Sequence, residues 1–72
     1  MAGNIVPGTT IARLRLRLCW TQDELGARIG RAGATVSRWE SGARTPSLED
    51  LQLVAEALGV TASLLVGAIA EP

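Results

Sequence analysis

The segment from Thr21 to Gly42 constrains the fold most, because it contains two short helix patterns with almost no chain between them. Thr21-Gln-Asp-Glu24 is a capping box, in which the threonine hydroxyl and the glutamate carboxylate accept hydrogen bonds from backbone amides at a helix start. It predicts a helix from about residue 22 to Gly30. A second helix is expected from Gly33 or Ala34 to Ser41, where Gly42 can take the left-handed conformation that ends a helix. Two short helices this close in sequence must cross steeply, which is the helix-turn-helix arrangement.

Helix signals also occur on both sides of this segment. Thr9 or Thr10 is a candidate cap for a first helix, and residues 1–8 are expected to form a flexible arm. Ser47-Leu-Glu-Asp50 predicts a fourth helix with two acids in its first turn, ending at Gly59. Thr61 is a candidate cap for a short fifth helix over residues 62–66. We therefore expect an all-α, compact five-helix bundle over residues 9–67, with the helix-turn-helix at 22–41 and a tail at 68–72.

The stretch RLRLRL, residues 13–18, alternates like a half-buried strand, yet helix is the better prediction. Ile11, Leu14, Arg15 and Leu18 share one face of a helix. A single strand among helices would have no partner to pair with. The helical interpretation leaves Leu16 near the surface.

Composition limits both the architecture and the chemistry. The chain has 72 residues, 47% of them hydrophobic and 3% aromatic, which suits one small domain with an aliphatic core. Cys19 is the only cysteine and there is no histidine, so we predict no metal site, no cofactor and no enzymatic activity. No apolar run is long enough to span a bilayer, and no leader is evident. We therefore expect no membrane partner and a cytoplasmic location.

Charge is unevenly distributed along the chain. All seven arginines and three acids lie in residues 1–44, giving +4, whereas four acids and no base in residues 45–72 give −4. The formal net charge of zero therefore hides one basic end. A nucleic-acid partner is compatible with this distribution.

The motifs TQDELGARIG, TVSRWESG, TPSLEDL and AEALGVTASLL, in this order and spacing, resemble the phage-repressor-like helix-turn-helix family of the Cro or XRE type. The resemblance covers about residues 10–66. It implies the family's five-helix fold and binding to double-stranded DNA. By this resemblance, Gln22 binds a DNA phosphate, and Ser41 and Arg44 contact the DNA backbone. The base-reading positions are Gly33, Ala34 and Arg38, with Thr35 and Ser37 beside them on the same helix.

Some positions depart from the family pattern or have two interpretations. Ala32 stands where the family usually has a capping Ser or Thr, and Gly33 and Ala34 lack the amide side chains that many members use to read bases. Direct readout then depends mainly on Arg38, which can bond guanine bidentately. Arg31 is expected either to contact a phosphate or to be solvated, with equal weight.

Several other residues are expected to be structural. The resemblance implies an ion pair between Arg15 and Glu40 that ties the first helix to the recognition helix. Trp39 is expected in the core and Trp20 in a hydrophobic staple with the second helix. Cys19, where the family often has glycine at the end of the first helix, is expected to be a structural thiol.

The apolar residues Leu16 and Leu53 lie off the predicted core stripes. Together with the end of the chain they give more apolar surface than a small monomer is expected to bury. We expect a homodimer interface at Leu64, Leu65, Val66 and Ile69. The predicted function is a sequence-specific transcriptional regulator, a repressor that binds a palindromic operator as a homodimer. The alternative is a protein-interaction module, such as an antitoxin that neutralises a partner protein, with DNA binding secondary.

Overall fold

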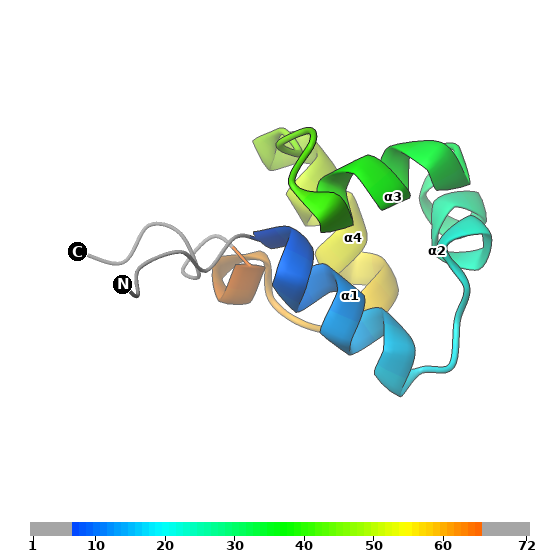
Figure 1. Cartoon of the computed structure of the whole chain (residues 1–72). Coiled ribbons are helices and arrows are strands. Elements are labelled where there is room, and N and C mark those ends of the chain that lie inside the picture. Colours follow the sequence, from blue (N-terminus) through cyan, green and yellow to red (C-terminus); the bar gives the residue numbers. More distant parts are fainter. Residues whose placement is uncertain (1–6, 66–72) are drawn as a thin grey trace.

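The computed structural model describes residues 7–65, which fold into a bundle of helices (Figure 1). The helices are α1 (Pro7–Arg17), α2 (Gln22–Ile29), α3 (Gly33–Ser41) and α4 (Leu48–Leu58), and residues 62–65 are also helical. There is no strand within residues 7–65, so the predicted all-α class is confirmed. The α2 and α3 helices pack most extensively on each other, α1 packs on α3, and α4 packs on α2. No helix of the described part is long and apolar enough to cross a membrane.

The predicted bounds of α2, α3 and α4 are confirmed, and local capping accounts for most of them. In the first capping box the Glu24 amide donates to Thr21 Oγ1 at 3.0 Å, and the Thr21 amide donates to Glu24 Oε1 at 2.7 Å. Ser47 and Asp50 form the corresponding box at the start of α4. The α3 helix ends at Gly42, whose φ of 86° lies in the left-handed region that glycine adopts without steric cost.

The start of α1 corrects one prediction. The helix begins at Pro7, so the last two residues of the predicted arm are helical, and Thr9 and Thr10 lie inside the helix. Proline suits a first helical position because its missing amide hydrogen would have no partner there. Gly8 is buried, and a methyl group on it would overlap the carbonyl oxygen of Trp39. Packing of α1 against the end of α3 therefore extends the helix beyond its expected cap.

The core lies where the helical interpretation of RLRLRL places it. Ile11 is fully buried, Arg15 is buried beside it on the same helix, and Leu16 is 61% exposed as predicted. Leu18 corrects the predicted face: it is 44% exposed, because α1 ends at Arg17 and Leu18 belongs to the following turn.

The end of the described chain corrects part of the predicted dimer interface. Leu65 is completely buried within the core of a single chain, whereas Leu64 is 49% exposed. Neighbouring residues on a helix point about 100° apart, and here Leu65 faces the core while Leu64 faces partly away from it. Leu53 is half-buried and packs against the core. Val66 and Ile69 lie outside the described residues, as do most of the predicted arm and the predicted tail.

Candidate nucleic-acid interface

The outer face of α3 carries small and polar side chains. Ala34, Arg38 and Ser41 are exposed, and Gly33, Thr35 and Ser37 are half-buried. The opposite face holds α3 on the bundle, with Val36 fully buried and Trp39 only 3% exposed. The core position predicted for Trp39 is confirmed. A helix face this small can enter a DNA major groove without steric conflict.

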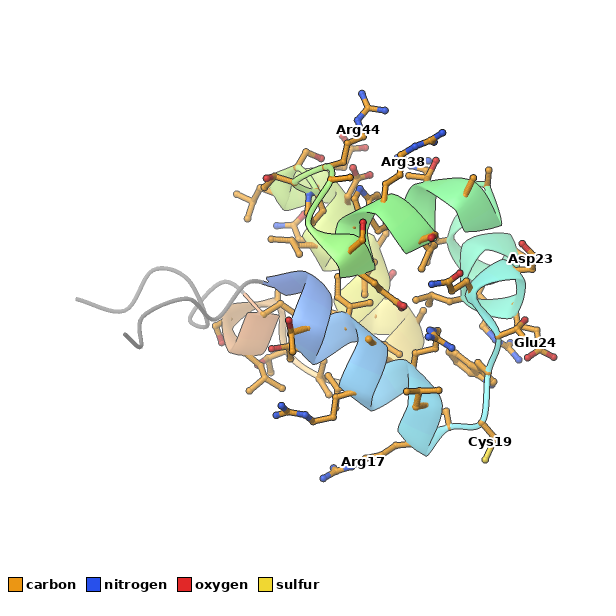
Figure 2. The ribbon with its side chains drawn as sticks, in the orientation of Figure 1. Arg17, Cys19, Asp23, Glu24, Arg38 and Arg44 are labelled. Carbon is orange, nitrogen blue, oxygen red and sulfur yellow. The ribbon has the colours of Figure 1, made fainter. Side chains whose placement is uncertain are left out.

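Two arginines extend from this side of the molecule. Figure 2 shows Arg38, from α3, and Arg44, from the following turn, both pointing away from the bundle. The Arg44 amide donates to the Arg38 carbonyl oxygen at 3.1 Å, which fixes the turn close to the helix end. The Ser41 hydroxyl donates to the same carbonyl at 3.2 Å and accepts from the Ala43 amide at 3.3 Å. The turn thus places Arg44 on the same side of the molecule as Arg38 (Figure 2).

The crossing of α2 and α3 depends on a missing side chain. A Cβ atom on Gly26 would lie 2.5 Å from the Arg31 carbonyl oxygen and 3.2 Å from the Gly33 nitrogen, so only a glycine lets the backbone of α2 come this close to the start of α3. Ala32 provides no side-chain hydrogen bond at the start of α3, as its departure from the family pattern predicted. The orientation of α3 is therefore set by packing rather than by its own cap.

An ion pair connects α1 to α3. Arg15 Nε donates to Glu40 Oε2 at 2.7 Å and its Nη2 donates to Glu40 Oε1 at 2.9 Å, so the pair predicted from the resemblance is present and bidentate. Arg15 Nη1 also donates to the Trp20 carbonyl oxygen at 2.6 Å. The hydrogen bond to Glu40 raises the pKa of Arg15 above its ordinary value, against the opposing effect of burial.

Gln22 joins the same ion pair. Its side-chain amide donates to Glu40 Oε1 at 2.9 Å, although the two residues are 18 positions apart. Gln22 lies at the start of α2, where backbone amides and the helix dipole attract anions. The contact with Glu40 holds this side chain at the helix start.

Arg31 pairs with Asp50, whereas the sequence predicted either a phosphate contact or a solvated side chain. Its Nε and Nη2 donate to Asp50 Oδ1 at 3.1 Å and 2.9 Å, so the turn between α2 and α3 is tied to the first turn of α4. Burial alone would raise the pKa of Asp50, but the hydrogen bonds from Arg31 and within the Ser47 capping box lower it overall. Sequence reasoning missed this pair because no local motif relates residues 19 positions apart.

The segment between α1 and α2 contains Trp20 and Cys19. Trp20 packs partly against the core, and the Arg28 guanidinium lies 4.0 Å from the centre of its ring, a cation–π contact. Cys19 has a positive φ of 60°, which explains why glycine suits this position. Its side chain is exposed, and the expectation of a structural thiol, which rests on the lack of a histidine to activate the sulfur, stays a prediction. Because the chain turns here in the left-handed conformation, the thiol points to solvent rather than into the core.

Metal-ligand chemistry is not indicated by the described part of the chain, in which no three His, Cys, Asp or Glu residues gather as a metal site would require.

Comparison with known proteins agrees with this geometry. The model of a helix-turn-helix family matches residues 11–65. The chain is similar to the P22 c2 repressor in its crystal structure with synthetic operator 9T and Tl⁺, with 28% identity and a TM-score of 0.79, covering 83% of this chain and 91% of that one. The sequence matches no curated protein. The chain therefore belongs to the Cro/XRE-type helix-turn-helix family of DNA-binding transcription regulators.

Proposed function

We propose that this protein is a sequence-specific transcriptional repressor that inserts α3 into the major groove of double-stranded DNA. The observation that carries the proposal is the small outer face of α3 with Arg38 and Arg44 projecting from it (Figure 2). The similar P22 c2 repressor was crystallised with an operator. The family is one of regulators, and the proposed activity requires no catalysis.

The proposed contacts divide into base reading and phosphate binding. Arg38 bonds a guanine bidentately, and Ala34 and Thr35 approach thymine methyl groups. Gly33 and Ser37 have small side chains or none, so they allow α3 to approach the DNA closely. The phosphate contacts come from Ser41, Arg44 and the second amide hydrogen of Gln22, whose first is bonded to Glu40. Contacts of this kind set the position of the protein on the duplex. Arg31 is left out of the proposed phosphate contacts because its guanidinium is already paired with Asp50.

The first test compares two exposed arginines. Arg38→Ala should lower discrimination at one base position by about 1–3 kcal/mol without affecting the fold. Arg17→Ala removes the same charge from α1, on the other side of the bundle (Figure 2), and should leave the base preference unchanged. Selection from a random duplex pool, followed by sequencing, measures both. An identical motif from wild type and Arg38→Ala would refute the role given to Arg38.

A second variant tests the register of α2 on the DNA. Gln22→Ala should weaken binding to all duplexes by a similar factor, because a phosphate contact carries no sequence information. A selective loss for one sequence would mean that the register is wrong.

We further propose that the repressor binds as a homodimer to a palindromic operator whose half-sites lie about one helical turn apart. Exposed apolar side chains support an interface: Leu64 is 49% exposed, Leu16 is 61% exposed and Leu18 is 44% exposed. The predicted interface keeps Leu64 and the undescribed Val66 and Ile69, but no longer Leu65. Leu64→Asp should give monomers in sedimentation, whereas Leu48→Asp, at a 60% exposed position at the start of α4, should not. A dimer that survives Leu64→Asp would place the interface elsewhere.

The same exposed leucines also favour the alternative function, a module that docks onto another protein. Salt dependence separates the two. DNA binding that neutralises several phosphates weakens steeply as salt rises, whereas an apolar docking surface does not. Absence of binding to any duplex at low salt would favour the alternative.

A further inference from the structure

The side chain of Asp23 occupies the space in which residue 33 would carry its own side chain. Asp23 lies in the first turn of α2, and Gly33 is the first residue of α3. A methyl group on Gly33 would overlap Asp23 Oδ1 and would lie 2.9 Å from Asp23 Cγ. A carboxylate from one helix therefore replaces the missing side chain of the other. Figure 2 shows Asp23 at the end of the molecule where α2 and α3 meet.

This carboxylate is free, unlike others in and around the helix-turn-helix. Glu24 accepts from the Thr21 amide, Glu40 accepts from Arg15, and Asp50 accepts from Arg31. Asp23 is exposed and has no hydrogen bond or ion pair with any residue between 7 and 65. Its oxygens are thus available to a partner outside the protein.

The start of α3 favours a carboxylate at this place. The first amides of α3 have no side-chain cap, since Ala32 provides none. The positive end of the helix dipole attracts an anion there. Because Gly33 has no side chain, nothing displaces the carboxylate from the end of the helix.

The chemistry of this position follows from how a recognition helix meets DNA. The N-terminal residues of the recognition helix lie closest to the base edges. An ionised carboxylate only accepts hydrogen bonds, and the matching donor in the major groove is the N4 amino group of cytosine. The same charge repels phosphates, so a carboxylate here can gain only from a base.

We propose that Asp23 is a specificity-determining residue that selects cytosine through its N4 amino group, in place of a base-reading side chain at Gly33. The inference rests on the proposed DNA binding. It adds an acidic reader on α2 to the basic reader Arg38 on α3, so the recognition surface combines residues from both helices.

A purely structural role makes different predictions. If Asp23 only stabilised the start of α3, its removal would weaken binding to every duplex alike. If it reads cytosine, Asp23→Ala removes the preference at one base position and also tightens binding to random duplex at low salt, because one repulsive charge is lost. The two roles therefore predict opposite changes in affinity for random DNA.

The experiment uses the whole chain and selection from a random duplex pool, with wild type, Asp23→Ala, Asp23→Asn and Gly33→Ala. Wild type should prefer cytosine about 5- to 150-fold at a position distinct from that affected by Arg38→Ala. Asp23→Ala should lose this preference, and Asp23→Asn should shift it to adenine, which an amide reads bidentately. Gly33→Ala should weaken it by displacing the carboxylate. Glu56→Gln, a charge-matched control at an exposed position of α4, should keep it.

The outcomes separate this inference from the function on which it rests. An unchanged motif in Asp23→Ala, while Arg38→Ala alters it, overturns the role of Asp23 and leaves the proposed repressor intact. A uniform loss of affinity with a lowered melting temperature in Asp23→Ala assigns the residue to structure and also overturns the inference. If wild type selects no motif from duplex DNA, both proposals fail.

Discussion

Breaking the Arg15–Glu40 pair should destabilise the whole bundle, because it joins α1 to α3 and also holds Gln22 of α2. The two side chains are only 10% and 8% exposed. Glu40→Leu keeps a side chain of similar size but leaves the guanidinium of Arg15 covered and without its counter-charge. Arg15→Met leaves the Glu40 carboxylate covered, with the amide of Gln22 as its remaining side-chain donor.

The size of the effect follows from the burial of the pair. Removing one partner of a buried ion pair costs about 3–5 kcal/mol, since the remaining charge stays away from water. A domain of this length has a total stability of about 4–11 kcal/mol at ~0.05–0.15 kcal/mol per residue. At about 4–8 °C per kcal/mol, the melting temperature should fall by about 12 °C or more. Either single variant thus removes a large part of the stability.

Urea unfolding followed by circular dichroism measures this free energy directly. The double variant Arg15→Met with Glu40→Leu is the control, because it replaces both charges with apolar groups and should recover most of the loss. The reasoning would be refuted if each single variant cost less than about 1 kcal/mol, the value of an exposed pair. It would also be refuted if the double variant were the sum of the two singles, because the cycle would then show no coupling.

Three further changes test other contacts. The pKa of Asp50 in the folded protein lies below its ordinary 3.8, so the ionised carboxylate stabilises the fold above that pH, and this stabilisation is lost as pH falls through the lowered pKa. In urea unfolding, the free energy of unfolding of wild type should exceed that of Asp50→Asn at pH 7, and the difference should narrow below about pH 4. A difference that does not change with pH would contradict the pairing with Arg31. Gly26→Ala should cost about 1–3 kcal/mol, because its Cβ would lie 2.5 Å from a backbone oxygen; an unchanged melting temperature would mean that the helices can separate there freely. Leu65→Ala should cost about 2–5 kcal/mol because the side chain is fully buried, and a loss below 1 kcal/mol in thermal unfolding would show that residues 62–65 do not belong to the core.

The helices and their ends were predictable because the interactions that define them are local. The capping boxes at Thr21 and Ser47 join residues three positions apart. Gly42 ends α3 through its own backbone conformation. Helical spacing around Arg15 also resolved the ambiguous RLRLRL stretch correctly, except at Leu18, which follows the helix end. The base-reading and phosphate positions came from the resemblance to a family rather than from local chemistry.

Tertiary structure alone decided which groups at the candidate interface are free and which are occupied. Arg31 pairs with Asp50 across 19 residues, and Gln22 bonds Glu40 across 18. Asp23 fills the space beside Gly33 only because α2 and α3 cross there. These contacts depend on how the helices approach one another, and a pattern that repeats every three or four residues carries no information on that approach. The sequence by itself determined the helices, whereas their packing determined which charged groups are paired within the bundle.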